Sequence, residues 1–285
     1  ARRGLIAAGK VEGGLGYGLL PFVVGIYEMQ VGRLDGELAQ LFETYYRQAF
    51  GQMLAVQPSV HRVIPVNESV RMDMEIRPYE SAAQIIHNAQ AWGVVDCICR
   101  MQKLLIGQPC MHPLDVCMVL SDTPNTFANS GAIHSLSRED AIDTLDRAAR
   151  AGLVHSVSNS QEGLWYICNC CTCSCGILRG MADLGIANVV ARSAYMSHLA
   201  DETLCTGCGS CHDTCQFNAI SLDHFIADVN QTRCVGCGLC VQACPSEALA
   251  LLARPADQVK PVPQTEMDWL ADRAAARGLS LEKVL

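Results

Sequence analysis

The sequence predicts an α+β protein, with a larger N-terminal α/β part followed by a small C-terminal domain built around a cysteine repeat. Eight cysteines near the C-terminus form the pattern C-x2-C-x2-C-x3-C twice. Upstream of them, apolar residues recur both at helical spacing and in the alternation typical of strands. Apolar residues make up 50% of the chain, which is enough to form a buried core.

Composition divides the 285 residues into four predicted segments. The first is an N-terminal α/β segment that we interpret as a partial winged helix. A cysteine-rich α/β domain with extra metal sites follows, and then the domain of the cysteine repeat. A proline-rich linker leads to a final helix, which docks either on this protein or on a partner. The predicted segments are 1–78, 79–200, 201–254 and 255–285.

Local patterns predict the elements of the first segment. The glycines of residues 11–18 indicate a turn in a hairpin-like stretch, and their spacing is not that of a nucleotide-binding loop. Apolar side chains at helical spacing predict a helix over 36–50. Strict alternation of apolar and polar residues predicts a strand over 72–76.

The second segment begins with a predicted helix after Pro78, for which Gly93 is the expected end. A buried strand is expected at 94–99. Side chains two positions apart share one face of a strand. We therefore expect Cys97 and Cys99 to point in the same direction.

The clearest predicted helix spans 138–151, where Ser137 and Asp140 suit an N-terminal capping box. The strand patterns at 153–158 and 164–168 are separated by a polar turn and predict a hairpin. A helix followed by a hairpin is the second half of a winged helix. We therefore expect winged-helix-like elements in the N-terminal part.

The cysteine repeat has a period of 29 residues, which is the separation between Cys205 and Cys234. In this spacing, three thiolates of one loop face three irons of a cluster, and the fourth cysteine ligates the other cluster. Glycines in each loop let the backbone wrap a cluster closely. Zinc sites seldom use this spacing, and disulfides need an oxidising compartment. We therefore predict two [4Fe–4S] clusters.

These motifs resemble those of the bacterial two-cluster ferredoxins, over residues 204–250. The resemblance implies a ferredoxin-like fold for the C-terminal domain. One departure is Gln216, where that family usually has proline. The resemblance assigns the first cluster to Cys205, Cys208, Cys211 and Cys244. It assigns the second cluster to Cys234, Cys237, Cys240 and Cys215.

Nine cysteines lie outside the repeat and predict one or two further [4Fe–4S] clusters. A third cluster is expected on Cys97, Cys99, Cys110 and Cys117. A fourth is expected on four of Cys168, Cys170, Cys171, Cys173 and Cys175, because two adjacent cysteines do not easily bind one cluster. Zinc in one site, free thiols, a redox disulfide and an unusual cluster with ligands pooled from both sets are the alternatives.

A second resemblance covers the chain from about residue 20 to its end. The segments Asp96–Arg100 (DCICR), Gly152–His155 (GLVH) and Ile167–Cys175 (ICNCCTCSC), followed by the repeat, are similar to a family of multi-cysteine 4Fe–4S binding proteins of anaerobic bacteria and archaea. The resemblance implies extra clusters and names no reaction.

Three residues near these cysteines are candidates for smaller roles. Arg100 either donates hydrogen bonds to a cluster or its cysteine ligand, or has an ordinary structural role. His112 and His155 are interpreted as structural histidines rather than ligands.

The net charge of −8 argues against nucleic acid as a partner and fits docking to a basic patch on a redox protein. No apolar run approaches the roughly 18 residues of a membrane span. Because low-potential clusters are sensitive to oxygen, we expect the cytoplasm of an anaerobe.

These features predict an iron–sulfur electron-transfer subunit that feeds or drains a larger anaerobic oxidoreductase. One alternative is an iron–sulfur enzyme with a catalytic cluster or thiol site at Cys168–Cys175. Another is a redox-responsive winged-helix regulator, against which the acidic balance counts. A subunit is favoured over a stand-alone enzyme.

Overall fold

The computed structural model describes residues 5–11, 13–70, 74 and 76–283. Within them the chain mixes helices and strands around a seven-stranded sheet, which confirms the α+β class. The strand order is β6-β4-β5-β8-β7-β3-β9, and all neighbours are antiparallel except β3 and β9. The strands are β3 (His61–Val63), β4 (Ala91–Val95), β5 (Cys117–Ser121), β6 (His134–Leu136), β7 (Val154–Ser158), β8 (Tyr166–Cys170) and β9 (Val190–Ala191).

One face of the sheet is covered by α3 (Ala82–Asn88) and α5 (Arg138–Arg150). Apolar side chains of both helices pack there against Met118, Leu120 and Ile167 of the sheet. The predicted capping box of α5 is present, since the Asp140 backbone N–H donates to Ser137 Oγ at 3.0 Å. This face is therefore an ordinary apolar core.

The opposite face carries a second core, to which Tyr46 and Phe50 after α1 (Gly36–Tyr45), Leu54 after α2 (Gly51–Met53) and Met181 of α6 (Arg179–Leu184) contribute. The helix predicted over 36–50 is observed as α1 followed by the wider turn η3 (Tyr46–Phe50). Another helix, α4 (Ile98–Leu105), contacts α1. Cysteines of the sheet point toward this side, as described below.

Two predictions around β4 are wrong. Gly93 does not end a helix, because α3 stops at Asn88 and Gly93 lies inside β4. A Cβ there would come within 2.4 Å of the Ile133 side chain, so close packing explains the glycine. The strand expected at 94–99 ends at Val95, and α4 begins at Ile98, because a short apolar run does not distinguish strand from helix.

The predicted strand at 72–76 falls largely on residues outside the described part of the chain. The hairpin in 11–18 is observed as β1 (Ile6–Val11) paired with β2 (Gly14–Leu19). The predicted helix and hairpin of 138–168 are also present as α5, β7 and β8. However, β7 and β8 lie inside the large sheet, where β7 also pairs with β3 of the N-terminal segment.

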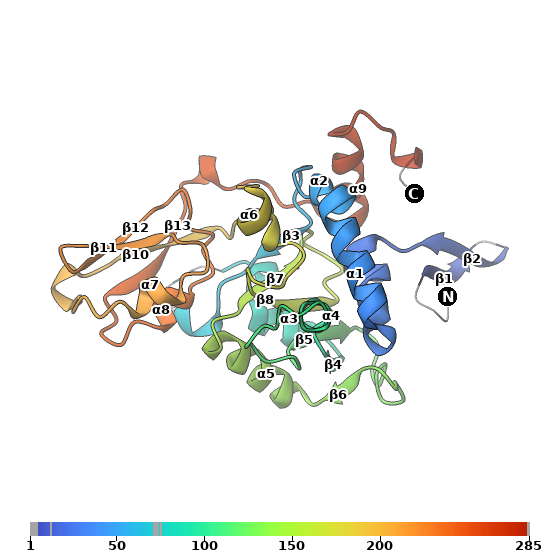
Figure 1. Ribbon diagram of the computed structural model, residues 1–285, viewed down its shortest axis with the longest axis horizontal. Helices are drawn as coiled ribbons and strands as arrows, with labels where there is room; N and C mark the ends of the chain where they lie inside the picture. Colours follow the sequence, from blue (N-terminus) through green and yellow to red (C-terminus); the bar gives the residue numbers. More distant parts are fainter. Residues whose placement is uncertain (1–4, 12, 71–73, 75, 284–285) are drawn as a thin grey trace.

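The C-terminal cysteine repeat lies in two small antiparallel pairs and two short helices. This segment (orange) is at one end of the molecule, and the β1–β2 hairpin (blue) is at the other (Figure 1). Its elements are β10 (Tyr195–Leu199), α7 (Ser210–Thr214), β11 (Ile220–Asp223), β12 (Ile226–Val229), α8 (Leu239–Gln242) and β13 (Leu249–Ala253).

The last helix, α9 (Glu266–Ala275), docks on this chain itself. The Arg273 guanidinium donates to the carbonyls of Val56 and Pro58, each at 2.6 Å, and Trp269 Nε1 donates to the Ser59 carbonyl at 2.9 Å. The structure thus decides between the two docking alternatives. No helix in the described ranges has the length and apolar character needed to cross a membrane.

Candidate metal centres

The four cysteines assigned to the first cluster come together around one small pocket, which is lined by Cys205, Cys208, Cys211 and Cys244. Gly207 lies between the first two with φ +67°, and a Cβ there would approach the Phe225 carbonyl oxygen to 2.5 Å. Only glycine relieves both constraints. Cys208 is exposed, so this pocket is open to solvent on one side.

The four cysteines assigned to the second cluster are also neighbours. Nearby Cys240, Cys234 and Cys215 help to raise the pKa of Cys237, after burial as the main cause. Backbone amides point at two of the sulfurs: Ser197 N donates to Cys234 Sγ at 3.4 Å, and Ala219 N donates to Cys215 Sγ at 3.3 Å. Such bonds stabilise thiolates and clusters, so both cysteine sets fit [4Fe–4S] ligation.

The nine remaining cysteines are not grouped as the sequence predicted. Seven of them line one cavity of about 330 Å³. Cys171 is one of the seven, but its thiol interacts with His112 and Cys173 on another side. The other six lie close enough together for neighbouring thiols to shift each other's pKa, and they are Cys97, Cys99, Cys117, Cys168, Cys170 and Cys175. Cysteines of both predicted sets thus line the same cavity.

Strand alternation explains three of these positions. Met118 of β5 and Ile167 of β8 pair and face the α3/α5 core. Their neighbours Cys117 and Cys168 therefore face the opposite side, and Cys170 shares the face of Cys168. The strands of the sheet thus present three sulfurs to one cavity.

The other three sulfurs come from chain turns. Cys97 is the N-cap of α4 and Cys99 lies in its first turn, so the positive end of the helix dipole faces their thiols. Cys175 follows a turn in which its N–H donates to the Cys171 carbonyl at 3.0 Å. The predicted strand gave the wrong reason for the proximity of Cys97 and Cys99, which a helix start provides instead.

Arg100 is a buried cation in the lining of this cavity, with only 1% of its surface exposed. Its guanidinium donates to the carbonyls of Pro113 and Asn169, each at 2.8 Å, while its Nε has no partner in the described residues. None of the ion pairs in this part of the chain includes Arg100.

A buried cation without a carboxylate is costly unless another anion lies near it. Burial lowers the pKa of Arg100, but the charges of Cys97, Cys171 and Cys117 outweigh burial and raise it. The pKa of Cys97 lies well below its ordinary value, because the Cys117 and Cys99 thiols donate hydrogen bonds to it. The cavity is therefore built for anionic sulfur, and its residues fit a metal–sulfur centre.

Sequence reasoning missed other residues in this lining. Glu28 lies there with its pKa raised to about 7 by burial, and its Oε2 accepts a hydrogen bond from Gly25 N at 2.7 Å. His61 is buried, its Nε2 has no hydrogen-bond partner among the described residues, and burial lowers its pKa to about 3. Both residues lie more than 30 positions from the nearest cysteine in the sequence, so no cysteine motif includes them.

A second group consists of Cys110, His112, Cys171 and Cys173, whose ligand atoms all lie within 4.8 Å of one another. Cys110 Sγ is 3.7 Å from Cys171 Sγ, 3.4 Å from Cys173 Sγ and 3.1 Å from His112 Nδ1. His112, interpreted from the sequence as structural, thus lies among three sulfurs. Cys170 and Cys171 point to different groups, in keeping with the expectation for adjacent cysteines.

His112 and Cys171 favour an ion pair in this group. The hydrogen bond that the His112 imidazolium donates to the Cys171 thiolate is the main cause that raises the pKa of His112 to about 9. Burial raises the pKa of Cys171, but the hydrogen bond of His112 and the charge of Arg100 outweigh burial and lower it to about 6. His155, the other histidine that the sequence indicates as structural, lies outside this group. It is buried, its Nδ1 lies 2.5 Å from Asn169 Oδ1, and burial lowers its pKa to about 4.

Gln216 connects the cysteine repeat to the cavity. Its Oε1 accepts a hydrogen bond from Thr172 N at 2.7 Å, and its Nε2 donates to the carbonyls of Gly152 and Cys170. Cys215 and the cavity's Cys170 also pack in the same apolar core. The residue that departs from the ferredoxin pattern therefore joins the second cysteine set to the cavity.

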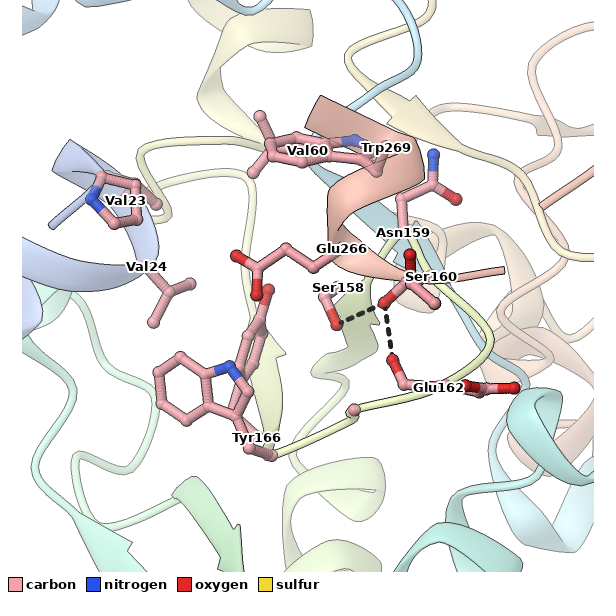
Figure 2. Close-up of a pocket in the computed structure, with 14 residues that line it drawn as sticks. Val23, Val24, Val60, Ser158, Asn159, Ser160, Glu162, Tyr166, Glu266 and Trp269 are labelled. Atoms are coloured by element: carbon pink, nitrogen blue, oxygen red, sulfur yellow. Dashed lines mark hydrogen bonds between the residues drawn. The ribbon is translucent and has the colours of Figure 1, made fainter. Parts of the chain in front are cut away.

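A further pocket of about 260 Å³ adjoins the cavity and shares Val23, Val24, Trp165 and Tyr166 with it. Figure 2 shows Glu266 and Trp269 of α9 on its other side and the Ser160 hydroxyl bonded to Ser158 and to the Glu162 backbone. The pocket therefore lies between α9 and residues that also line the cysteine cavity.

Comparison with known proteins identifies one part of the chain. Residues 204–248 match the family model of the 4Fe-4S dicluster domain. No curated protein and no solved structure matches the chain. The match lies on the eight cysteines that the structure gathers into two sets. The chain is therefore an iron–sulfur protein whose dicluster domain carries [4Fe–4S] clusters and gives it the capacity for electron transfer.

Proposed function

We propose that this chain is an electron-transfer module in which the dicluster domain exchanges electrons with a third iron–sulfur centre in the cysteine cavity. The observation that carries the proposal is the convergence of six sulfurs and the buried Arg100 on one cavity. Four thiolates are enough for a cubane. Two further sulfurs remain, which suits either a larger cluster or one with exchangeable ligands.

The dicluster ligands in this proposal are those that the resemblance assigns, with Cys244 and Cys215 crossing between the two cysteine loops. When bound, each cluster takes up or releases one electron at a time. The exposed Cys208 puts the first set closest to an external donor or acceptor. The second set adjoins the cavity, since Cys215 and Cys237 pack against the same core as Cys170 and Cys175. The three sites thus follow one another along the molecule.

The partner in this proposal is a larger oxidoreductase of an anaerobe, in a reducing cytoplasm. The net charge of −8 supports docking to a basic surface. All seventeen cysteines are free thiols in the structure, as ligation by metal requires.

Iron and acid-labile sulfide per chain, measured on anaerobically purified protein, test the third centre. Two cubanes account for about eight irons, so we expect about twelve or more of each element. Cys97→Ser and Cys175→Ser should lose only the iron above eight. As a matched control, Cys205→Ser should lose iron from the dicluster domain. About eight irons in the unaltered protein would contradict the proposal.

The adjoining pocket favours a second candidate, an iron–sulfur enzyme whose catalytic centre is the cavity. The unpartnered His61 Nε2 and the neighbouring 260 Å³ pocket supply a polar contact and room for a small substrate. Cyanide is a suitable probe of an open metal position. If it changes the electron paramagnetic resonance (EPR) signal of the cavity centre and leaves the dicluster signals unchanged, the enzyme gains support. Unchanged signals would leave electron transfer as the function.

A further inference from the structure

The Cys110–His112–Cys171–Cys173 group lies apart from the six sulfurs of the proposed third centre. Each half of the group offers two donors one residue apart, in a C-x-H and a C-x-C pair. The halves are 61 positions apart in the chain, as measured from Cys110 to Cys171. Only the fold brings them together.

The distances within the group distinguish one metal ion from a cluster. Tetrahedral zinc with bonds of about 2.3 Å to sulfur and 2.0–2.1 Å to nitrogen has sulfurs about 3.8 Å apart and sulfur about 3.6 Å from nitrogen. Cys110 Sγ lies 3.4 Å from Cys173 Sγ and 3.7 Å from Cys171 Sγ. The distances from His112 Nδ1 to Cys110 and Cys173 sulfurs are 3.1 and 4.0 Å.

A cubane does not fit the same atoms. In a [4Fe–4S] cluster each thiolate binds a different iron, so the core of eight atoms lies between the sulfurs and holds them well apart. Here the ligand atoms nearly touch. Three sulfurs and one imidazole nitrogen around a single centre form the Cys3His set typical of structural zinc.

The surroundings suit such an ion. Pro109 and Pro113 flank Cys110 and His112 and restrict the backbone conformations of that loop. Ser174 Oγ donates to Cys173 Sγ at 3.8 Å. Three thiolates and Zn²⁺ leave one negative charge, and the charge of Arg100 reaches Cys171.

We propose that Cys110, His112, Cys171 and Cys173 bind one structural Zn²⁺ ion. The ion would clamp the 110–112 loop to the turn between Cys170 and Cys175, two sulfurs of the cavity. The same turn faces the dicluster domain, because Thr172 and Cys173 share a groove with Gln216. The zinc would therefore set the position of cavity sulfurs relative to the second cysteine set. The proposal does not depend on the third iron–sulfur centre.

Zinc and iron per chain, measured together by mass spectrometry of the purified holoprotein, test this assignment. We expect about one zinc in the unaltered protein and none in His112→Ala or Cys173→Ser. Cys173 is the exposed ligand, so its replacement disturbs packing least. His134→Ala, at an exposed histidine of β6, is the matched control and should keep its zinc. The iron of the dicluster domain should remain in all four proteins.

A second measurement separates metal loss from unfolding. Co²⁺ supplied in place of zinc should give the intense visible bands of a tetrahedral thiolate site, and His112→Ala should weaken or shift them. Retained dicluster absorption shows that the variant is folded. Iron lost from His112→Ala in place of zinc would overturn the assignment, and so would an unaltered protein without zinc. In either case the cavity proposal keeps its own test, the iron above eight.

Discussion

At the scale of single residues, Arg100 explains most about the cysteine cavity. A guanidinium that is buried without a carboxylate costs several kcal/mol unless anions surround it. Its hydrogen bonds go to two carbonyls, so the neighbouring thiolates must supply the negative charge. The sequence left open whether Arg100 donates hydrogen bonds to a cluster or its cysteine, or has an ordinary structural role. The structure adds an electrostatic role, the balancing of thiolate charge, which neither spacing nor composition indicates.

Replacing Arg100 by methionine should lower the midpoint potential of the cavity centre. The reduced form is the more negative one, and it loses a nearby positive charge. A redox titration followed by EPR measures the shift. Arg138→Met, at an exposed position of α5, should leave every potential unchanged. An unaltered cavity potential in Arg100→Met would show that Arg100 is only structural.

At the scale of elements, a buried ion network joins three helices beside the cavity. Glu43 of α1 accepts hydrogen bonds from Arg179 of α6 at 2.7 and 2.9 Å. Lys103 of α4 lies 3.9 Å from the same carboxylate. Burial raises the pKa of Glu43, but the hydrogen bond and charge of Arg179 and the charge of Lys103 outweigh it and hold the pKa below normal.

Glu43→Gln should destabilise the fold by about 3–5 kcal/mol, because it leaves buried cations without their partner. Urea unfolding at pH 7 measures the loss, and Glu37→Gln on the exposed side of α1 should be nearly neutral. A lowered pKa contributes stability above the unfolded value of about 4.3. The difference between the proteins should therefore shrink as pH falls below about 4. A loss independent of pH would contradict this origin.

Gln216 is the second feature at this scale, since it follows Cys215 of the dicluster domain and bonds to the turn that contains Thr172. Gln216→Ala leaves the Thr172 N–H without its acceptor, which costs about 1–3 kcal/mol when the group is buried. We expect slower electron exchange between dicluster domain and cavity, measured by rapid-mixing reoxidation. Gln57→Ala removes a side-chain hydrogen bond to the Asn188 carbonyl, between segments that carry no cysteine, and should leave this rate unchanged.

At the scale of the whole molecule, charge and layout favour a positively charged redox partner. The chain has a net charge of −8, and thiolate-bound clusters add to it. The dicluster domain lies at one end (Figure 1), with Cys208 exposed there. A positively charged protein would therefore be attracted to the molecule before it docks.

Electron exchange with a cationic partner protein should slow as salt rises. The Debye length falls from about 30 Å at 0.01 M to about 3 Å at 1 M ionic strength, which screens the attraction. Stopped-flow rates over this range measure the effect, and a small uncharged mediator should show little dependence. A rate that is insensitive to salt with the cationic partner would argue against electrostatic docking.

Local patterns were enough for the features that depend on near neighbours in the chain. The capping box of Ser137 and Asp140, the hairpin after α5 and the doubled cysteine spacing each lie within a few tens of residues. The residues that form each of these features are therefore close together in the chain, where a sequence pattern can indicate them. The sequence by itself determined the α+β class and an iron–sulfur dicluster domain, because four cysteines at fixed spacing already constrain their own loop.

Only the tertiary structure decided how the other nine cysteines are divided. Cys117 and Cys168 share a cavity because two distant strands pair in one register, and a shift of one residue would turn both sulfurs to the opposite face. Cys110 joins Cys171 through a loop contact across 61 positions. Spacing along the chain carries no information on such pairings, since they depend on strand register and on which face of the sheet the core covers.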